Sequence, residues 1–423
     1  MTTNKLTIAL LLALAISTPA KGARAPGADS PAAQTPAGPK AGKEGVRQLG
    51  TVQVIGKAGY ASHPAYDTKE ANLGPLGNRS IKDTPMSLTV LPEQLLVNQQ
   101  IKTVNDALRN LPSVTIRDQQ GLEVSRPQSR GFVSTIDQNT RIDGMNVIGT
   151  TAIPAENLSG IEVLNGLAGA LYGPETPAGV FNYILKRPTR EPLTRLIENY
   201  DSQSTFTEQL DLGGPVGPGR HLGYRLNAVH GEGEGYVDGS RTNRTLLSGA
   251  LDYRIGEQTV VETNFSHYET NVTGLPGSVV YFGASGSTKL PKAFDPTTPG
   301  FGQRGAGTDL RSDMALAKLK HDFGNGWTFE IGALYENAIR NLFGITNTFI
   351  NDAGDFEVTK NFNAIPRYTI LSNTARLNGH FQWLGTENDV SIGTNGFSDQ
   401  RYSCRNSIAV PLGSSNIADP VLF

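Results

Sequence analysis

The stretch that decides the fold runs from Asn105 to Pro188. It contains the segments NDALRNLP (105–112), SRGF (129–132), RIDG (141–144), GIEVLNG (160–166), ALYG (170–173) and AGVFN (178–182). Residues 106–110 predict a short helix that ends before Pro112, because proline disfavours helical geometry in the residue before it. Runs of β-forming residues at 140–142, 161–164 and 180–185 predict strands, with a helix of small residues between the last two. The sequence therefore predicts a compact α/β unit, whose glycines serve tight turns and close backbone contacts rather than ligand binding.

After Pro188 the sequence changes to alternation with a period of two. Residues 327, 329, 331, 333 and 335 are apolar and belong to one face of a predicted strand, whereas 328, 330, 332, 334 and 336 belong to the other. Aromatic residues stand near both ends of the apolar face. Residues 222–228 and 247–254 repeat the alternation. One such strand would equally suit a soluble sandwich. Several, taken together with the N-terminal signal peptide and the plug-like unit described below, favour a membrane β-barrel with one face toward lipid and the other toward water.

Strands are predicted near 193–200, 204–212, 221–231, 243–254, 258–269, 311–322, 327–340, 367–383 and 388–402. Short connections alternate with long ones at 271–310 and 341–367. Short turns on one side and long loops on the other are typical of a barrel in the outer membrane. Earlier in the chain, residues 86–91 predict a strand, and Pro92 opens a helix through about Gln100.

Composition excludes several classes of function. The 423 residues carry a formal net charge of −2, so no basic field points to nucleic acid. The six histidines show no metal-ligand spacing, and no dinucleotide-binding, phosphate-loop or nucleophile-elbow motif indicates an enzyme. Cys404 is the only cysteine, which excludes an internal disulfide and a thiolate metal site. It is interpreted as a loop thiol, or as one whose partner lies in sequence beyond these residues.

The order and spacing of the motifs between 105 and 188 resemble the plug domain of TonB-dependent outer-membrane receptors, especially the ferric-siderophore group. The resemblance extends from about Gly50 to the last residue, with its specificity in the plug. It implies an α/β plug domain at 73–190, followed by an antiparallel transmembrane β-barrel at 191–423 that is incomplete in this chain.

The N-terminal region predicts export and coupling. The apolar run from Leu6 to Ile16 behind Lys5 predicts a signal peptide over 1–20, because it is too short to span a membrane. An Ala/Pro/Gly-rich linker follows at 21–48. By position and pattern, 49–57 resembles a TonB box, the segment that a periplasmic coupling protein captures as an added strand. Its core residues are Thr51, Val52, Gln53, Val54 and Ile55.

The resemblance also implies site residues. Those expected in plug structure or anchoring are Arg130, Gly131, Arg141, Asp143, Gly144, Glu162, Asn165, Gly166, Tyr172, Gly173, Gly179 and Asn182. Arg130 is expected either to pair with carboxylates or to contact ligand, since its planar guanidinium needs several acceptors inside a lumen. Further candidates for ligand contact are Gly149, Thr150, Pro154 and Tyr268. Relatives usually carry Arg-Gly-Pro after the Glu-Val-Leu motif, whereas here Asn165-Gly166-Leu167 follows, so a charge that could lock plug to wall is missing.

The expected function is energy-coupled import of a ferric siderophore across the outer membrane of a Gram-negative bacterium. The expected partners are TonB with its inner-membrane energy-transducing complex, the ferric siderophore and outer-membrane lipid. No cofactor or resident metal is expected, because iron would arrive as a pre-formed chelate. The alternatives are a receptor for cobalamin, haem or an oligosaccharide, and a non-transporting surface protein such as an adhesin or pore.

The chain is also expected to be the N-terminal part of a transporter, with an unclosed wall. Barrels of about eight strands are filled by their own side chains, whereas plugged transporters need about 22. Residues 403–423 are predicted to be an external loop, with no closing strand after it.

Overall fold

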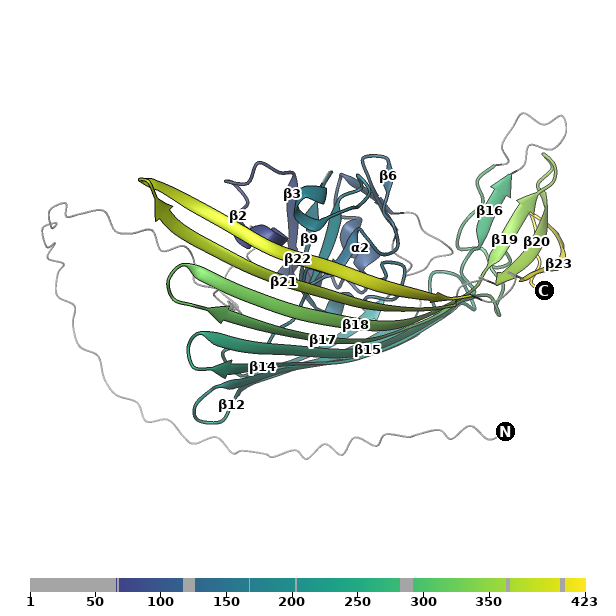
Figure 1. Ribbon diagram of the computed structural model, residues 1–423. Helices are drawn as coiled ribbons and strands as arrows, with labels where there is room; N and C mark the ends of the chain where they lie inside the picture. Colours follow the sequence, from purple (N-terminus) through teal and green to yellow (C-terminus); the bar gives the residue numbers. More distant parts are fainter. Residues whose placement is uncertain are drawn as a thin grey trace, which may run out of the picture. The chain divides into compact units, whose positions relative to one another are not determined.

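The computed structural model describes residues 66, 68–116, 126–166, 168–201, 204–281, 292–362, 366–403 and 408–423. They belong to one unit, Leu49–Phe423. The predicted signal peptide, linker and TonB box, and Cys404, lie outside the described residues. Figure 1 shows three sets of elements: the plug, a wall of long strands, and a small sheet at one end of the wall.

The plug is built on a five-stranded sheet with the order β3-β9-β10-β7-β8. Its strands are β3 (Leu88–Pro92), β9 (Leu158–Leu164), β10 (Val180–Leu185), β7 (Thr140–Ile142) and β8 (Met145–Asn146). β10 pairs in parallel with β7, and the other pairs are antiparallel. Nearly every residue of β9 and β10 is buried, which suits their β-branched and aromatic sequences at the centre of a sheet.

Short helices pack on this sheet. They are α1 (Glu93–Asn98), α2 (Val104–Leu108), α3 (Gly169–Tyr172) and the 3-10 turns η1 (Gly74–Leu76) and η2 (Ala155–Asn157). α2 begins after Thr103, whose hydroxyl accepts from the Asp106 amide at 3.1 Å. This cap explains why the helix starts two residues before the predicted 106–110. None of the helices in the described ranges is both long and apolar enough to cross a membrane.

Two small sheets complete the plug. One has the order β4-β5-β6, with β4 (Val114–Ile116), β5 (Pro127–Ser129) and β6 (Phe132–Val133). The other pairs β1 (Glu70–Asn72) with β2 (Asn78–Ser80) and shares no strand with the five-stranded sheet. Neither sheet was predicted from the sequence, because strands of two or three residues carry no periodic signal.

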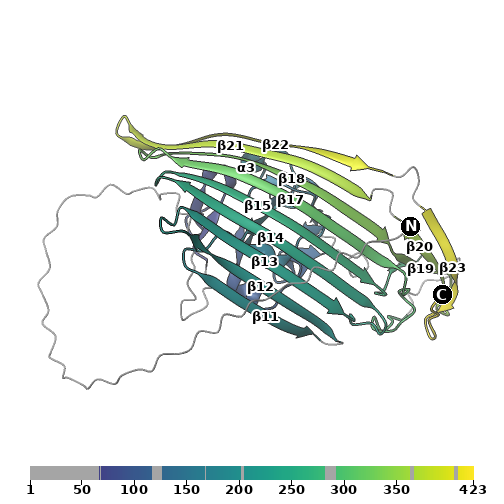
Figure 2. The same ribbon diagram turned by 90° about the horizontal axis from the view of Figure 1, so that it is seen from below.

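The wall is a sheet of nine antiparallel strands in chain order, seen side by side in Figure 2. The strands are β11 (Leu193–Asp201), β12 (Thr205–Val216), β13 (Leu222–Gly233), β14 (Arg241–Ile255), β15 (Thr259–Thr273), β17 (Gly307–Asp322), β18 (Trp327–Phe343), β21 (Arg367–Trp383) and β22 (Thr386–Tyr402). The number and order of the predicted strands are confirmed. Among the described residues β11 pairs only with β12 and β22 only with β21, so the predicted unclosed wall is confirmed for this part of the chain.

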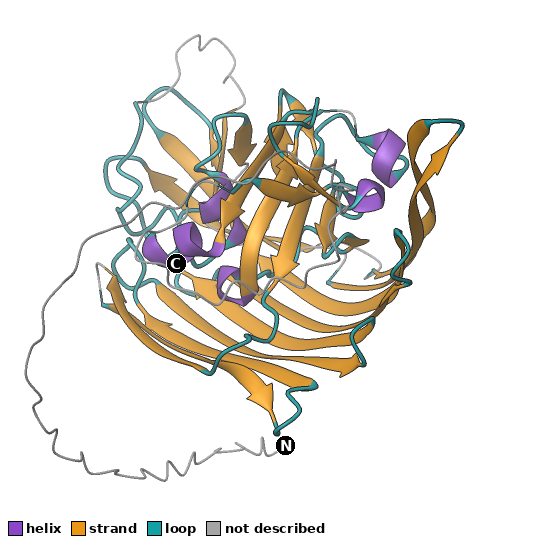
Figure 3. Ribbon diagram, turned by 90° about the vertical axis from the view of Figure 1, so that its left-hand side faces the viewer, coloured by secondary structure: helices purple, strands orange, loops and turns teal. Residues whose placement is uncertain are grey.

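The two faces of the wall differ as the alternation predicts. Leu196, Leu247, Phe265 and Ile392 are all more than half exposed on the face turned away from the plug. On the opposite face, alternate residues are buried along much of β12 to β21, and Met314, Leu316 and Leu334 join the hydrophobic core of the plug. The plug and its helices thus lie against the concave face of the wall, as Figure 3 shows.

The long connections are not plain loops, and this prediction was wrong. The connections 274–306 and 344–366, together with the segment after β22, contribute β16 (Ser278–Tyr281), β19 (Ile345–Phe349), β20 (Asp355–Phe362) and β23 (Ile408–Asn416). These strands form a separate sheet with the order β16-β19-β20-β23. Its own core includes Phe301, Phe349 and Phe356. The strands were missed because they pair across connections far apart in sequence.

Candidate functional site: the interface between plug and wall

A row of charged residues crosses the concave face of the wall, and we call it the charged belt. It consists of Arg195, Asp211, Arg225, Asp252, Glu262, Lys318, Lys320, Glu330 and Arg376. Neighbouring strands place these charges directly opposite one another: Arg195 faces Asp211, Glu262 faces Lys318, and Glu330 faces both Lys320 and Arg376. Because side chains alternate between faces, every second residue of a strand can join the belt.

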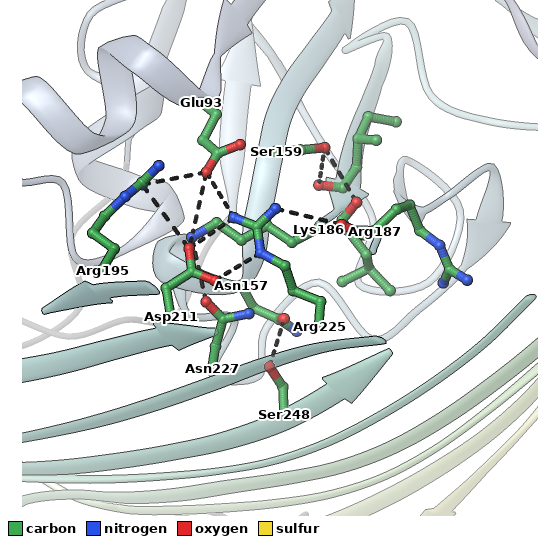
Figure 4. Close-up of polar contacts among 12 residues, drawn as sticks. Glu93, Asn157, Ser159, Lys186, Arg187, Arg195, Asp211, Arg225, Asn227 and Ser248 are labelled. Atoms are coloured by element: carbon green, nitrogen blue, oxygen red, sulfur yellow. Dashed lines mark hydrogen bonds and ion pairs between the residues drawn. The ribbon is translucent and has the colours of Figure 1, made fainter. Parts of the chain in front are cut away.

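The first anchor of the plug on the belt is drawn in Figure 4. Asp211 is fully buried and accepts two hydrogen bonds of 2.7 Å from the Arg225 guanidinium. Lys186, at the end of the plug, donates to the same carboxylate at 3.1 Å and is only 1% exposed. Glu93 of α1 lies 3.2 Å from Arg225 and 3.6 Å from Lys186. Lys186 of the plug and Arg225 of the wall therefore share two carboxylates, Glu93 of the plug and Asp211 of the wall.

Arg187 forms the second anchor. It pairs with Asp252 and donates to the carbonyl oxygens of Leu251 and Thr263 at 3.2 Å. Asp252 stands opposite Glu262 on the next strand, and Glu262 in turn binds Lys320 at 2.7 Å. The neighbouring carboxylates Asp252 and Glu262 are thus balanced by two cations, Arg187 of the plug and Lys320 of the wall.

A third anchor uses no cation. Glu336 of β18 is 2% exposed and accepts from the Ile148 amide at 3.0 Å, the Thr151 hydroxyl at 2.9 Å and the Ser312 hydroxyl at 3.1 Å. Ile148 and Thr151 belong to the plug, so a wall carboxylate caps a plug turn through neutral donors.

Several predicted plug residues form an internal framework. Arg141 is buried and donates to Asn146 at 2.7 Å and to the Tyr172 carbonyl at 3.1 Å, with its guanidinium 4.6 Å from the Tyr172 ring centroid. Burial lowers the pKa of Arg141 and raises that of Tyr172. Asn165 accepts from the hydroxyls of Ser113 and Ser129 at 3.1 and 3.2 Å. The residue in place of the expected arginine therefore joins segments within the plug.

Glu162 and Asn182 sit on adjacent strands of the plug sheet. The Asn182 amide donates to one Glu162 oxygen at 2.9 Å, and the Asn72 backbone N–H donates to the other at 2.7 Å. Burial raises the pKa of Glu162 to about 7. The Asn182 oxygen accepts from the Gly144 amide at 2.9 Å, in a turn where both Asp143 and Gly144 have positive φ.

The remaining predicted glycines stand in left-handed backbone. Gly166, Gly173 and Gly179 have φ of 90°, 84° and 88°. At Gly179 a Cβ atom would lie 2.1 Å from the Leu164 carbonyl oxygen, so no other residue fits there without movement. These positions match the predicted roles in turns and close contacts.

Arg130 and Gly131 form the tip of the β5–β6 hairpin, with φ of 54° and 82°. The Arg130 side chain is exposed, and within the described ranges no ion pair or hydrogen bond of its side chain is recorded. Its expected roles as an anchor or a ligand contact stay predictions.

The four other ligand-contact candidates are placed inside the packing of plug and wall. Thr150 and Tyr268 are each 1% exposed, and Tyr268 packs with Ala152 of the plug. Gly149 and Pro154 are also buried. In this arrangement the plug segment 147–155 lies against the wall, and a role of these four residues in ligand contact stays a prediction.

The residues that hold the plug on the wall were not predicted individually. Glu93, Lys186, Asp211, Arg225 and Glu336 carry no motif of their own, and strand alternation shows only that the wall residues face inward. Within the described ranges, no group of three or more His, Cys, Asp or Glu side chains could hold a metal ion.

Residues 80–180 match the family model described as TonB-dependent Receptor Plug Domain. The Ferric-pyoverdine BN7/BN8 receptor of Pseudomonas putida is 25% identical over 368 residues, which are 82% of this chain and 43% of that protein. The Ferrichrome receptor FcuA of Yersinia enterocolitica is 23% identical over 357 residues, 82% of this chain and 46% of the relative. This chain thus spans less than half the length of these curated relatives.

Among solved structures, BauA, the ferric preacinetobactin receptor from Acinetobacter baumannii, superposes with a TM-score of 0.72 at 20% identity. The alignment covers 84% of this chain and 53% of that one. Residues 80–180 therefore form a TonB-dependent receptor plug domain, as the motifs predicted. The plug and the wall beside it share the fold of the solved ferric preacinetobactin receptor.

Proposed function

We propose that the receptor carrying these 423 residues imports a ferric siderophore across the outer membrane, with energy supplied from the inner membrane. The observation that carries the proposal is the plug, which is seated against the concave face of the wall by buried ion pairs at Asp211 and Asp252. A plug held by buried charges obstructs passive diffusion. It therefore suits a transporter whose path opens only when work is done on the plug.

The exposed apolar face of the wall supports the membrane location. Side chains such as Leu247 and Ile392 are 61% and 62% exposed, which is unfavourable in water and favourable in hydrocarbon. Curated relatives named as ferric-pyoverdine and ferrichrome receptors support a siderophore as the solute. Iron would enter as a pre-formed chelate, and transport rather than catalysis is the proposed activity.

Energy coupling is assigned to Thr51–Ile55. The segment is rich in β-branched residues and follows an Ala/Pro/Gly-rich stretch, so a periplasmic TonB protein can add it as a strand to its own sheet. Pulling on this segment would act on the plug through residues 70–80, which come next in the described chain.

The test is growth on a panel of ferric siderophores as sole iron source, with haem as a separate arm. A deletion strain is compared with strains complemented by the wild-type receptor and by a Val54→Pro variant. We expect one chelate class to support growth only with the wild-type receptor. Unimpaired growth of the deletion strain on every chelate, or loss on haem alone, would refute the siderophore assignment. Growth with the proline variant would rule out Thr51–Ile55 as the coupling strand.

A further inference from the structure

Residues 70–80, comprising β1, η1 and β2, form a segment that we call the strap. β1 and β2 pair only with each other, through three residue pairs. The strap therefore adds no strand to the plug sheet, and its hold on the plug depends on side-chain contacts. In the described part of the chain, the strap also contains the first secondary structure after the proposed coupling residues, so a pull from the N-terminus reaches it before the plug sheet.

Glu162 makes the contact at the end of β1. Its carboxylate, on the inner strand β9, accepts the Asn72 backbone N–H at 2.7 Å. The Asn72 side chain then accepts the Gly74 amide at 2.8 Å, which fixes the start of η1. Glu162 is 8% exposed, and its second oxygen is occupied by Asn182. One buried carboxylate thus joins the strap to the plug sheet.

The wall holds the other side of the strap. Arg376 of the charged belt donates to the Gly74 carbonyl, and the Ser391 hydroxyl donates to the Pro75 carbonyl at 2.7 Å. Gly74 has a φ of 58°, and a Cβ atom there would lie 2.5 Å from the Tyr172 ring. The absence of a side chain at Gly74 therefore allows η1 to pack on the ring.

These contacts close a ring of polar interactions. From Glu162 the ring passes through Asn182 to the turn at Asp143 and Gly144. The Asp143 carbonyl accepts from Lys318 of the wall at 2.7 Å, and Lys318 lies 3.7 Å from Glu330. Glu330 binds Arg376, which returns to the strap at Gly74. The strap is the one member of this ring that leads toward the N-terminus.

We propose that Glu162 is a positioning residue that latches the strap to the plug, so that withdrawal of the strap opens the ring joining plug and belt. This inference rests on the proposed function for its role in coupling. The antiparallel β1–β2 pair has its open end at Glu70 and Ser80, so tension at Glu70 separates the pairs one at a time. Within the strap, the Asn72–Glu162 hydrogen bond ties the loosened strand to the plug sheet.

The test is hydrogen exchange of the purified receptor in detergent. In Glu162→Gln the new amide group faces the Asn182 amide, so two donors meet. We expect peptides covering 70–80 to exchange roughly tenfold faster or more, as for loss of a hydrogen bond to a charged group, while residues 180–185 stay unchanged. Glu175→Gln is the matched control: Glu175 is a plug carboxylate that accepts the Ala168 amide at 2.9 Å and touches no strap residue.

The double variant Glu162→Gln, Asn182→Asp restores a hydrogen bond between positions 162 and 182, with donor and acceptor exchanged. The carboxylate introduced at position 182 would accept from the amide introduced at position 162 and from the Gly144 backbone. The side-chain oxygen at position 162 would still accept from Asn72, so we expect slow exchange to return in the strap.

If Glu162→Gln fails to fold, Gly74→Ala tests the strap from its own side and should loosen 70–80 alone. Unchanged strap exchange, an equal rise at 180–185, or no rescue by the double variant would overturn the latch. The measurement uses neither siderophore nor TonB, so failed uptake would refute the proposed function without touching this result.

Discussion

Replacing Asp211 by asparagine should loosen the junction between plug and wall. The substitution keeps the shape of the side chain but removes the charge shared by Lys186 and Arg225, at 3.1 and 2.7 Å. Lys186 then keeps the Glu93 carboxylate, at 3.6 Å, and the neutral Asn227 side-chain oxygen, at 3.4 Å. Removing one partner of a buried ion pair typically destabilises by about 3–5 kcal/mol. Since each 1.4 kcal/mol is about a factor of ten, local opening should become roughly a hundred- to a few-thousand-fold more frequent.

The assay is hydrogen exchange of peptides covering 183–192 and β11 in the receptor. Asp309→Asn is the matched control, because Asp309 is exposed on the outer face and accepts only a 3.3 Å hydrogen bond from Asn341. The double variant Lys186→Met, Asp211→Asn should recover part of the lost protection, since it removes the stranded cation, whereas Arg225 keeps Glu93. Equal exchange in Asp211→Asn and Asp309→Asn, or no recovery in the double variant, would refute the anchoring argument.

Three further predictions address coupling, the plug tip and pH. Val54→Pro removes a backbone donor and should abolish uptake while surface binding of the chelate persists; normal uptake would rule out 51–55 as the coupling strand. Arg130→Ala should leave plug exchange unchanged because the side chain is exposed, so a loss of siderophore affinity would identify a ligand contact, and loosened exchange would instead identify an anchor. Burial raises the pKa of Glu162 and of Glu175 to about 7, so the folded plug binds protons more tightly than the unfolded chain. The resulting stability is fully present below about pH 4.5 and is lost as the pH rises through 7. Thermal melting of the plug between pH 5 and 8 should show this decline, and Glu162→Gln should reduce it; a flat profile in the wild type would contradict the assignment.

The sequence was sufficient where local rules decide structure. β10 was predicted at its observed bounds, because a run of β-forming residues between Gly179 and Pro188 predicts a strand. The nine wall strands followed from alternation, which also identified the inner face. The outer sheet did not follow, since β16 pairs with β19 across more than sixty residues and β23 with β20 across a further connection. β16, with four residues, is also too short to show a period of its own.

The site was less predictable than the fold because pairing depends on three-dimensional register. Alternation shows that Asp211 and Arg225 face inward, but only the register of β12 with β13, and the seating of Lys186, brings them to one point. Conversely, Tyr268 was expected as an aromatic residue lining the outer vestibule, although aromatic residues near strand ends more often belong to an interfacial girdle. Its burial against Ala152 depends on the turn taken by the plug segment 147–155, which no local pattern encodes.

Asn165 supports the internal structure of the plug, and other residues anchor the plug on the wall. An arginine there would have to point its charge at a wall carboxylate, whereas Asn165 satisfies two serines inside the plug. The wall carboxylate Glu336 is held instead by a backbone amide and two hydroxyls, which gives orientation without a cation. The ion pairs between plug and wall lie elsewhere. Lys186 and Arg187 form them where the plug continues into β11, and Lys102–Asp201, Glu156–Arg244 and Asp137–Arg401 form them in other parts of the plug. Towards the N-terminus, the strap is held by hydrogen bonds to Glu162, Arg376 and Ser391, by the Arg79–Asp389 ion pair and by packing of Gly74 on the Tyr172 ring. Because residues 70–80 precede all these ion pairs of the plug in sequence, a pull from the N-terminus would load the contacts of the strap first.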